Sequence, residues 1–363
     1  MANTAVNALS IQKKYEKRYF KEMVRSNQFN AYMGAGAMNP IVVKRQLVES
    51  GQLINIPLIS ALNGNGVGTG TLTGNEEALG NFSYDVKPYW HRHAVVVPKD
   101  QQKWSSFDLK GGAREMLMLW DTDEIRDAII DGMTAVTISG AYDAENGHSQ
   151  QVYLKDSSTA QKNTWSAANE FRLLFGDSFS NYNATFATAL ATVGSGDELG
   201  VNEVALMKRQ ARKRNKATGL PQVRPIRVSG VSREYYVMFT GSNNFAKLKA
   251  DMNTINLDGR PRDVASNPIF QDGDLEYDGV IIREIPEQLT GVAAGLSANQ
   301  EGAYLMGAQA MALAWSQTPI ATQSSENDYG FRPGKGTESS FSAEKLVYNG
   351  LDHGMVTGFF YTA

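Results

Sequence analysis

Histidines are the first residues to test for metal or acid–base chemistry. The 363-residue chain has four of them and no cysteine. His91 and His93 lie two residues apart in a run with the periodicity of a strand, so both side chains would point to one face. A zinc site needs at least a third ligand, and no carboxylate lies at a matching spacing. We therefore interpret both as ordinary strand residues and expect no metal and no cofactor.

A glycine-rich segment, residues 63–75, has the composition of a phosphate-binding loop but not its pattern. Such a loop ends in Lys-Ser or Lys-Thr and opens a helix, whereas Glu76 and Glu77 follow this segment. Their carboxylates would repel a phosphate. Neighbours on an extended chain point apart, which also argues against an acid–base pair. Because no serine lies in the Gly-x-Ser-x-Gly pattern of a nucleophile elbow, the sequence predicts no catalytic site.

The segments on either side of these glycines predict a long β-hairpin. Residues 52–58, 82–86 and 89–97 alternate between apolar and polar side chains, as half-buried strands do. The tip between the first two, residues 62–78, is longer than connections inside compact domains usually are. We expect this tip to project from the body, to be mobile in an isolated subunit and to be ordered by a partner.

A long helix is predicted from Ser106 to about Ile138. Either Ser106 or Asp108 can cap its first turn, and an apolar stripe follows. At about 1.5 Å per residue, such a helix would be roughly 45 Å long. A polar break at residues 121–124 leaves two shorter core helices as the alternative.

Basic side chains gather in two places, and we predict an assembly contact at each. One is a helix from Glu203 to about Asn215, capped by Asn202, with these outward cations: Lys208, Arg209, Arg212, Lys213 and Arg214. No helix-turn-helix pattern surrounds it, so we expect no reading of a specific DNA sequence.

The other basic region is an N-terminal arm with an amphipathic basic helix that carries Lys13, Lys14, Lys17, Arg18, Lys21 and Arg25. A glycine-rich breaker at residues 33–40 would detach the arm, and packing of the arm helix on its own body is an equal alternative.

The rest of the chain predicts a mixed β/α body. Strands are predicted at residues 223–228, 235–240, 280–285, 303–306 and 355–361. A helix with Phe245 and Leu248 on its inner face is predicted at residues 242–252. Residues 140–200 are weakly patterned and predict only short pieces.

Composition excludes several classes of protein. The net charge is only −3 with 42% apolar residues, so no global field marks a nucleic-acid binder. The lack of cysteine fits a reducing cytoplasm. The N-terminus lacks the apolar run of a signal peptide, and the longest apolar stretch, residues 303–315, is shorter than the roughly 18 residues that span a bilayer. We expect a soluble protein that is not exported, with two intertwined or sequential domains.

The order of these parts resembles the fold of tailed-bacteriophage major capsid proteins, the Hong Kong 97-like capsid fold. The parts predicted for this chain and the parts of that fold follow the same order: a basic arm, a projecting hairpin, a long helix, a mixed β/α body and a terminal strand. Short motifs are similar to those of the subfamily that includes the coat protein of phage N-four. These motifs are GNEEAL at 74–79, YVMF at 236–239 with FAKL at 245–248, NPIF at 267–270, YDGVII at 277–282, AYLMGAQA at 303–310 and DYG at 328–330.

The resemblance implies an α+β fold in five parts. They are an N-terminal arm at 1–45, an extended hairpin loop at 46–104, a peripheral domain with a spine helix at 105–200, an axial domain at 201–335 and a C-terminal return to the peripheral domain at 336–363. The arm and the extended loop would reach across neighbouring subunits. The implied assembly-interface residues are Lys13, Lys14, Lys17, Arg18, Glu76, Glu77, Lys208, Arg209 and Arg212.

The function implied by the resemblance is that of a major capsid protein and not of an enzyme. Such a protein self-assembles as hexamers and pentamers into the icosahedral head of a tailed phage, inside the host bacterial cytoplasm, around double-stranded DNA that it contacts non-specifically. Further implied partners are a decoration or cement protein, a scaffold and a portal, with no membrane. Two alternatives stay open: another shell-forming protein such as a nanocompartment, and a cytoplasmic α/β enzyme, which would need a triad or cofactor loop that we do not find.

Overall fold

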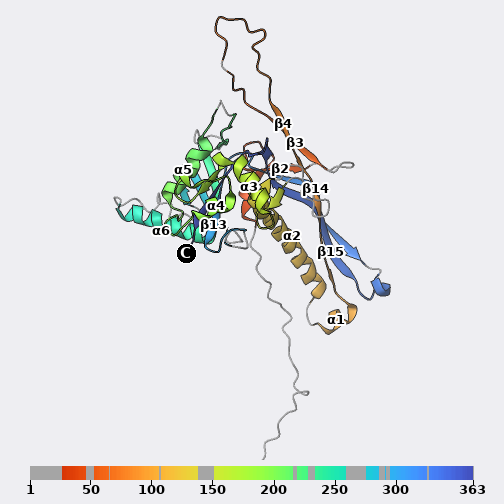
Figure 1. The fold of residues 1–363 in the computed structure, drawn as a ribbon. Coiled ribbons are helices and arrows are strands. Elements are labelled where there is room, and N and C mark those ends of the chain that lie inside the picture. Colours follow the sequence, from red (N-terminus) through yellow and green to blue (C-terminus); the bar gives the residue numbers. More distant parts are fainter. Residues whose placement is uncertain are drawn as a thin grey trace, which may run out of the picture. The chain divides into compact units, whose positions relative to one another are not determined.

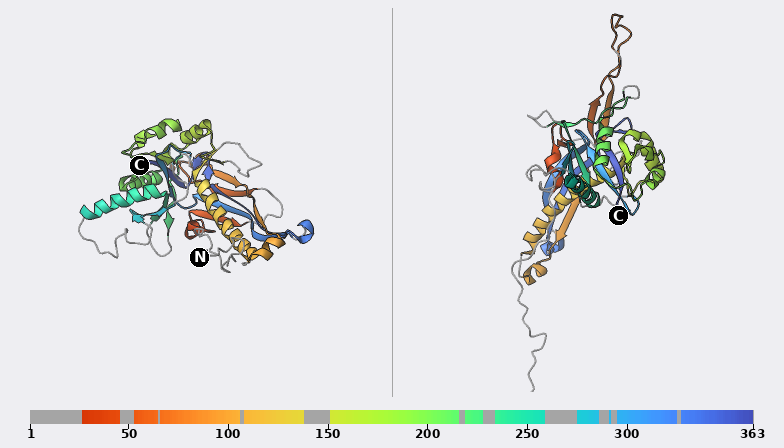
Figure 2. Two further views of the ribbon diagram at one scale, coloured as in Figure 1. Left: turned by 90° about the horizontal axis from the view of Figure 1, so that it is seen from below. Right: turned by 90° about the vertical axis from the view of Figure 1, so that its left-hand side faces the viewer.

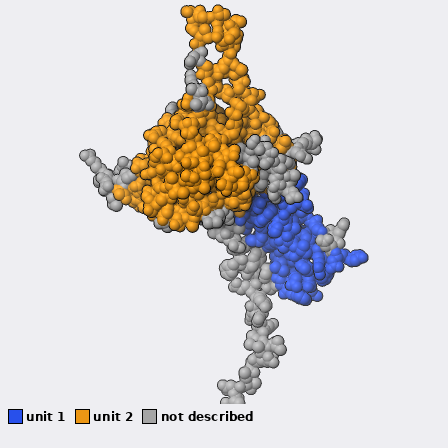
Figure 3. Space-filling view, viewed as in Figure 1, with its two compact units in different colours: residues 1–28, 90–126, 317–340 blue, residues 29–89, 127–316, 341–363 orange. Residues whose placement is uncertain are grey.

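The structure is a computed structural model of the chain. It describes residues 27–45, 53–64, 66–105, 108–137, 151–215, 219–227, 234–258, 275–285, 291, 295–324 and 327–362. The chain divides into two compact units (Figure 3). Unit 1 comprises residues 1–28, 90–126 and 317–340, and unit 2 comprises residues 29–89, 127–316 and 341–363.

Unit 2 is built on a mixed β-sheet. Its strand order is β11 (Leu275–Tyr277), β12 (Val280–Glu284), β10 (Glu234–Thr240), β13 (Gln300–Met306), β18 (Met355–Tyr361) and β8 (Leu173–Phe175), and β9 (Ile226–Arg227) pairs with β10. β10 is parallel to β12 and antiparallel to β13, whereas β18 is antiparallel to β13 and parallel to β8. All residues of β13 are buried, which is typical of a strand with both faces covered.

The predicted strands of this body are largely confirmed. Those at 235–240, 280–285 and 355–361 correspond to β10, β12 and β18, and the one at 303–306 begins earlier, at Gln300. The strand predicted at 223–228 is shorter than expected, because only Ile226 and Arg227 pair with β10.

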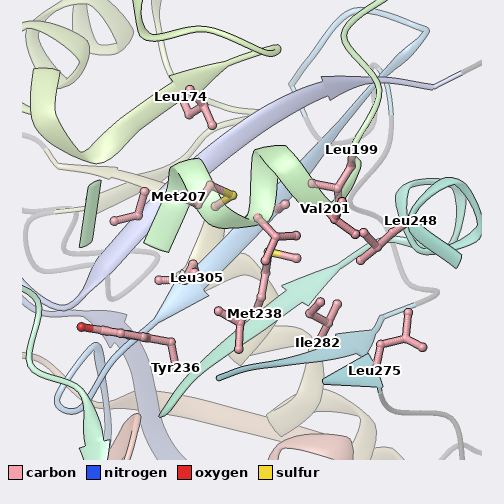
Figure 4. Packing of buried hydrophobic residues seen from close by; sticks show 14 of the residues in the cluster. Leu174, Leu199, Val201, Met207, Tyr236, Met238, Leu248, Leu275, Ile282 and Leu305 are labelled. Carbon is pink, nitrogen blue, oxygen red and sulfur yellow. The ribbon is translucent and has the colours of Figure 1, made fainter. Parts of the chain in front are cut away.

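Two hydrophobic cores cover the two faces of this sheet. Phe359 and Phe360 are neighbours on β18 and point to opposite faces. Phe360 packs in the core that contains Met207 of α5 (Val201–Arg212) and Leu248 of α6 (Ser242–Asp258), part of which is shown in Figure 4. Phe359 packs in the core formed with α3 (Thr159–Ala168) and α4 (Phe186–Ala191). The predicted helix at 242–252 is confirmed and extends to Asp258.

The hairpin predicted around the glycine-rich segment is confirmed. β3 (Ile54–Ile59) and β4 (Asn81–Val86) are antiparallel, with Ile54 opposite Val86. The base of this hairpin is buried in unit 2, since Ile56 and Tyr84 belong to one of its hydrophobic clusters. Beyond the base, the hairpin runs away from the central sheet of the same unit (Figure 1 and Figure 2).

The long helix is also confirmed as a single element. α2 (Leu109–Thr134) is continuous across residues 121–124, so the alternative of two shorter helices is wrong. The Asp108 carboxylate accepts a hydrogen bond from the Lys110 N–H at 3.1 Å, as expected of a capping residue. Ser106, the other candidate cap, lies outside the described residues. The helix ends before the predicted Ile138, because β6 (Ala135–Thr137) begins there and pairs with β7 (Gln151–Tyr153).

The beginning of α5 corrects a second prediction. Its N-cap is Gly200, and Asn202 lies inside the helix. Two carboxylates satisfy the first N–H groups: Glu203 accepts from Gly200 and Asp251 accepts from Val201, both at 2.9 Å. Because these side chains take the role of a cap, no Ser, Asn or Asp is needed at the N-cap position.

The described part of the predicted arm is not detached. Phe29, in the short helix η2 (Gln28–Tyr32), is 1% exposed, and its ring centroid lies 5.0 Å from that of Phe239. β1 (Met33–Gly34) and β2 (Ile41–Arg45) follow, and β2 pairs with the start of β14. The Pro40 carbonyl accepts from the N–H groups of Ala310 and Met311 at 2.9 and 3.0 Å. The prediction of a detaching breaker at residues 33–40 is therefore wrong.

Several elements were not predicted from the sequence. The largest are β14 (Met311–Ser324) and β15 (Gly334–Lys345), which, like α2, contribute residues to both units. Others include α1 (Lys99–Trp104), η3 (Glu170–Arg172), η4 (Phe179–Asn181), η8 (Asn327–Gly330), β16 (Val347–Tyr348) and β17 (Leu351–Asp352). The predicted strand at 89–97 is β5 (Tyr89–Val96). No helix of the described residues is long and apolar enough to cross a membrane.

A buried carboxyl group connects β13 to the start of α6 and predicts a pH dependence. Glu301 is 1% exposed, and its carboxylate accepts from the Asn244 N–H at 2.6 Å. Burial raises the pKa of Glu301 from 4.5 to about 7, although backbone hydrogen bonds from Asn244 and Asn243 oppose the shift. Between these pH values the folded protein holds a proton that the unfolded chain has released. Its stability therefore falls as the pH rises through this range.

We expect the Glu301→Gln variant to lack this pH dependence. The amide oxygen can accept the same N–H groups and does not ionise, so the wild-type protein should lose up to about 3 kcal/mol relative to the variant between about pH 5 and about pH 8. Urea unfolding of both proteins at the two pH values measures the difference. Parallel stability profiles would show that Glu301 titrates normally in the folded protein.

Candidate assembly surfaces

The loop of the β3–β4 hairpin exposes large apolar side chains. Its base closes with a hydrogen bond from the Ser60 N–H to the Gly80 carbonyl at 2.9 Å. Leu72 and Leu79 are 64% and 59% exposed, and Leu62 is exposed as well. Exposed apolar side chains gathered on one segment are typical of a contact surface. The sequence pattern indicated a role for the glycines and glutamates of this loop but not for its leucines.

Glu77 has a structural role inside the loop. Its two carboxylate oxygens accept from the N–H groups of Asn63 and Gly64, both at 2.7 Å. Glu76 accepts from the N–H of Gly74 at 2.6 Å, within its own turn. Glu77 thus connects the two sides of a loop whose glycines would otherwise leave it unconstrained. Residues 53–86 contain Glu76, Glu77 and Asp85 and no lysine or arginine, so the hairpin carries negative charge only.

The basic face of α5 is partly paired within the chain. Lys208 lies 2.8 Å from the carboxylate of Asp278, which is in the turn between β11 and β12. Arg212 and Arg227 share Glu234, with N–O distances of 3.7 and 3.1 Å. The pairs of Arg212 and Arg227 with Glu234 are more exposed and contribute little stability, so a partner could replace them. The Lys208 side chain is only 14% exposed.

Two cations at the C-terminal end of α5 lie over aromatic rings. The Arg209 guanidinium is 5.2 Å from the centre of the Phe179 ring, and Lys213 Nζ is 4.3 Å from that of Phe171. These four side chains line a cleft of ≈570 Å³, together with Glu170, Leu173, Tyr182, Gln210 and Arg212. The aromatic rings orient the cations without neutralising them. An acidic segment with apolar side chains would match this cleft.

The predicted site residues are therefore placed as follows. Lys208, Arg209 and Arg212 lie on one face of α5, as expected, and Glu76 and Glu77 lie on the hairpin loop. The Arg214 guanidinium donates to the Leu62 carbonyl and to the Asn63 side-chain oxygen, both at 3.3 Å, and so connects α5 to the hairpin of its own chain. Lys13, Lys14, Lys17 and Arg18 lie outside the described residues.

His91 and His93 have ordinary side-chain partners in unit 1. His91 Nδ1 lies 2.9 Å from the Glu124 carboxylate, and the His93 ring packs on Trp120 with a centroid distance of 4.9 Å. Nowhere in the described part of the chain do three or more His, Asp or Glu side chains come together as metal ligands.

Comparisons with known proteins show the family of the chain. A family model described as phage capsid protein matches residues 3–357. The capsid asymmetric unit of cyanophage Pam1 is 32% identical, with a TM-score of 0.85 and 100% of both chains covered. The capsid of Ralstonia phage GP4 is 17% identical, with a TM-score of 0.71 over 100% of this chain and 99% of that one.

A third capsid shares the fold at lower identity. The head structure of Helicobacter pylori bacteriophage KHP40 is 14% identical, with a TM-score of 0.64 over 98% of this chain and 96% of that one. No curated protein matches the chain. The match of the family model spans nearly the whole sequence, and these capsid structures share the fold of the chain. The chain belongs to the phage capsid protein family and is a major capsid protein that forms the shell of a tailed-phage head.

Proposed function

We propose that this capsid protein assembles as hexamers and pentamers into an icosahedral head around double-stranded DNA, and that its role requires no catalytic centre. Assembly would take place in the host bacterial cytoplasm. The hairpin loop would belong to an extended-loop region, residues 46–104, α2 to a peripheral domain, residues 105–200 with a return at 336–363, and α5 and α6 to an axial domain, residues 201–335. A scaffold, a portal and a decoration or cement protein are further candidate partners.

The observation that carries this proposal is the hairpin loop with its exposed Leu72 and Leu79. In an isolated subunit these side chains face water, which is unfavourable by about 25 cal/mol for each Å² of apolar surface that a neighbour could cover. A shell repeats every contact many times, so a small gain per subunit is enough to favour assembly. The loop of one subunit would lie on its neighbour, where Glu76 would face basic side chains.

The basic face of α5 suits such a contact by charge. Lys208, Arg209 and Arg212 are cations, whereas the hairpin carries only acidic groups. Opposite potentials steer two surfaces into register and select against wrong partners. We propose the same role for Lys13, Lys14, Lys17 and Arg18 of the arm, residues 1–45. Non-specific contact of these cations with packaged DNA is also expected, since phosphates bind exposed lysine and arginine without reading sequence.

Replacement of residues 62–78 by a two-residue Asn-Gly turn tests the proposal. That turn is compatible with a two-stranded hairpin, and the deleted side chains are almost all exposed, so the variant should fold with an unchanged melting temperature. We expect few or no shells by electron microscopy.

The double substitution of Leu62 and Leu72 by serine is the matched control, since both exposed side chains lie within the replaced segment. It keeps the loop and its length and removes only the apolar contact, so it should reduce the shell yield less than the deletion does. Normal shells from the deletion variant would show that the loop has no part in assembly.

A further inference from the structure

The base of the hairpin is held by the hydroxyl groups of two tyrosines. Tyr84 of β4 is 2% exposed, and its hydroxyl donates to the Glu344 carboxylate at 2.6 Å and accepts from the Gln151 amide at 2.9 Å. Tyr348 of β16 donates to the Ile56 carbonyl at 3.2 Å, on the other strand of the hairpin. All five residues belong to unit 2. Each strand of the hairpin is thus connected to the body of its own unit through one tyrosine hydroxyl.

The partners of Tyr84 are themselves fixed in position. Gln151 accepts from the Lys345 N–H at 3.3 Å and donates to the Lys345 carbonyl, so the backbone of β15 holds its amide in one orientation. Glu344 accepts in addition from Ser342 at 3.2 Å. Because the acceptor and donor on either side of the Tyr84 hydroxyl are held, the hydroxyl has one favourable position.

The hydrogen bonds of the two tyrosines are directional, whereas the apolar contacts around them are not. The apolar side chains around them, such as Ile54 and Val86 against Leu346 and Val347, pack in one cluster. Apolar packing is non-directional, whereas a hydrogen bond weakens steeply as its angle departs from linear. Burial raises the pKa of Tyr348 to about 12, so its hydroxyl remains a donor at any pH at which the shell would form.

A small rotation at the base has a large effect at the tip. At about 3.3 Å per residue, an extended strand would place Thr73 roughly 35 Å from Tyr84. A tilt of about 10° at the base would then move the tip by roughly 6 Å, more than the distance over which side chains stay in contact.

We infer that Tyr84 and Tyr348 are positioning residues, which fix the direction in which the hairpin leaves the subunit and hence where its loop meets a neighbour. This inference rests on the proposed role of the loop in assembly. According to this inference, the two hydroxyls determine the geometry of the shell and are not required for a shell to form.

The direction of the hairpin can be measured in the full-length chain. Because the protein has no cysteine, Thr71→Cys at the loop and Ala167→Cys on α3, both exposed, accept a pair of spin labels without other substitutions. Double electron–electron resonance then gives the distance distribution between them in unassembled subunits. We expect the Tyr84→Phe/Tyr348→Phe variant to show a broader or shifted distribution than the parent.

Tyr236→Phe is the matched control, since the buried Tyr236 hydroxyl donates to the Val223 carbonyl at 3.2 Å and is not part of the hairpin base. It removes a bond of the same kind, so it should cost about as much stability as the single substitution Tyr348→Phe and leave the distance distribution unchanged. If the double variant fails to fold, each single Tyr→Phe variant is measured in its place. An unchanged distribution in the double variant, or an equal change in Tyr236→Phe, would overturn the inference.

Assembly of the same variants supplies the second readout. The double variant should form shells of abnormal or mixed diameter, whereas Tyr236→Phe shells should match the parent. Parent-like diameters in the double variant would contradict the inference and leave the role of the loop intact. By contrast, normal shells after replacement of residues 62–78 would refute the proposed role of the loop in assembly, whatever the distance distributions show.

Discussion

Replacement of Asp352 by alanine is expected to destabilise the folded subunit by about 3–5 kcal/mol, because it leaves a buried lysine without its counter-ion. Lys345 and Asp352 are 1% and 2% exposed, and Lys345 Nζ lies 2.8 Å from the Asp352 carboxylate. The same carboxylate oxygen accepts from the Trp165 indole N–H at 3.1 Å. Burial already lowers the pKa of Lys345, and the attraction of Asp352 only partly opposes this.

Two further variants test whether the loss of stability comes from burial of an unpaired charge. Glu198→Ala breaks an ion pair of similar length, 2.7 Å to Lys247, but both side chains are 36% exposed, so it should cost only about 0–1 kcal/mol. The double variant Lys345→Met/Asp352→Leu removes both charges at once and should recover most of the lost stability, since a buried pair can often be replaced by apolar side chains without net loss. Urea unfolding measures all three. A cost for Asp352→Ala no larger than that for Glu198→Ala would show that the buried pair is not needed for stability.

Deletion of residues 2–26 is expected to abolish shell formation while leaving the subunit folded. The deleted segment carries Lys13, Lys14, Lys17 and Arg18, which we propose to be assembly contacts. The described chain resumes at Asn27, immediately before the buried Phe29. The body should therefore keep its circular dichroism and melting temperature, and electron microscopy should show no shells.

A longer deletion separates assembly from folding. Removal of residues 2–30 also takes away Phe29, which packs edge-on against Phe239, and loss of a buried phenylalanine side chain usually costs about 3–5 kcal/mol. The longer deletion should therefore lower the melting temperature and the shorter one should not. Shells of normal size and yield after the shorter deletion would show that the arm is dispensable.

The sequence predicts those elements that have an apolar period or a continuous apolar run. The strands β3 and β4 and the helices α2 and α6 have alternation or apolar stripes, β10 and β18 are almost continuously buried, and each is found where it was expected. Helix ends are predicted less well, because a cap can come from a distant residue. For α5 it is Asp251, far along the chain, that accepts from Val201, and nothing in the local sequence indicates it.

β15 shows why other elements could not be predicted. Much of this strand is polar and yet buried, including Ser339, Ser340, Ser342, Glu344 and Lys345. Its buried polar groups are satisfied by partners outside the strand, such as Tyr84 for Glu344 and Asp352 for Lys345. Since burial there depends on these pairings and not on hydrophobicity, the pattern looks like an exposed loop.

The candidate surfaces could be predicted only in part, because some of their contacts exist only in the folded protein. Charge and glycine content are visible in a sequence, so the hairpin tip and the basic face of α5 could be found. The rings of Phe171 and Phe179 beneath Lys213 and Arg209 could not, because they lie in a weakly patterned region and meet α5 only in the folded protein. The bond between Glu77 and the opposite side of its own loop depends likewise on the closed hairpin.

Electron microscopy of the purified full-length protein tests the central claim most directly. A major capsid protein that assembles through its own surfaces should give closed shells of uniform diameter, or rings of five and six subunits, when its concentration is raised. Monodisperse monomers or small oligomers at every concentration, with or without the other head proteins of the phage, would contradict the assignment of a shell-forming role.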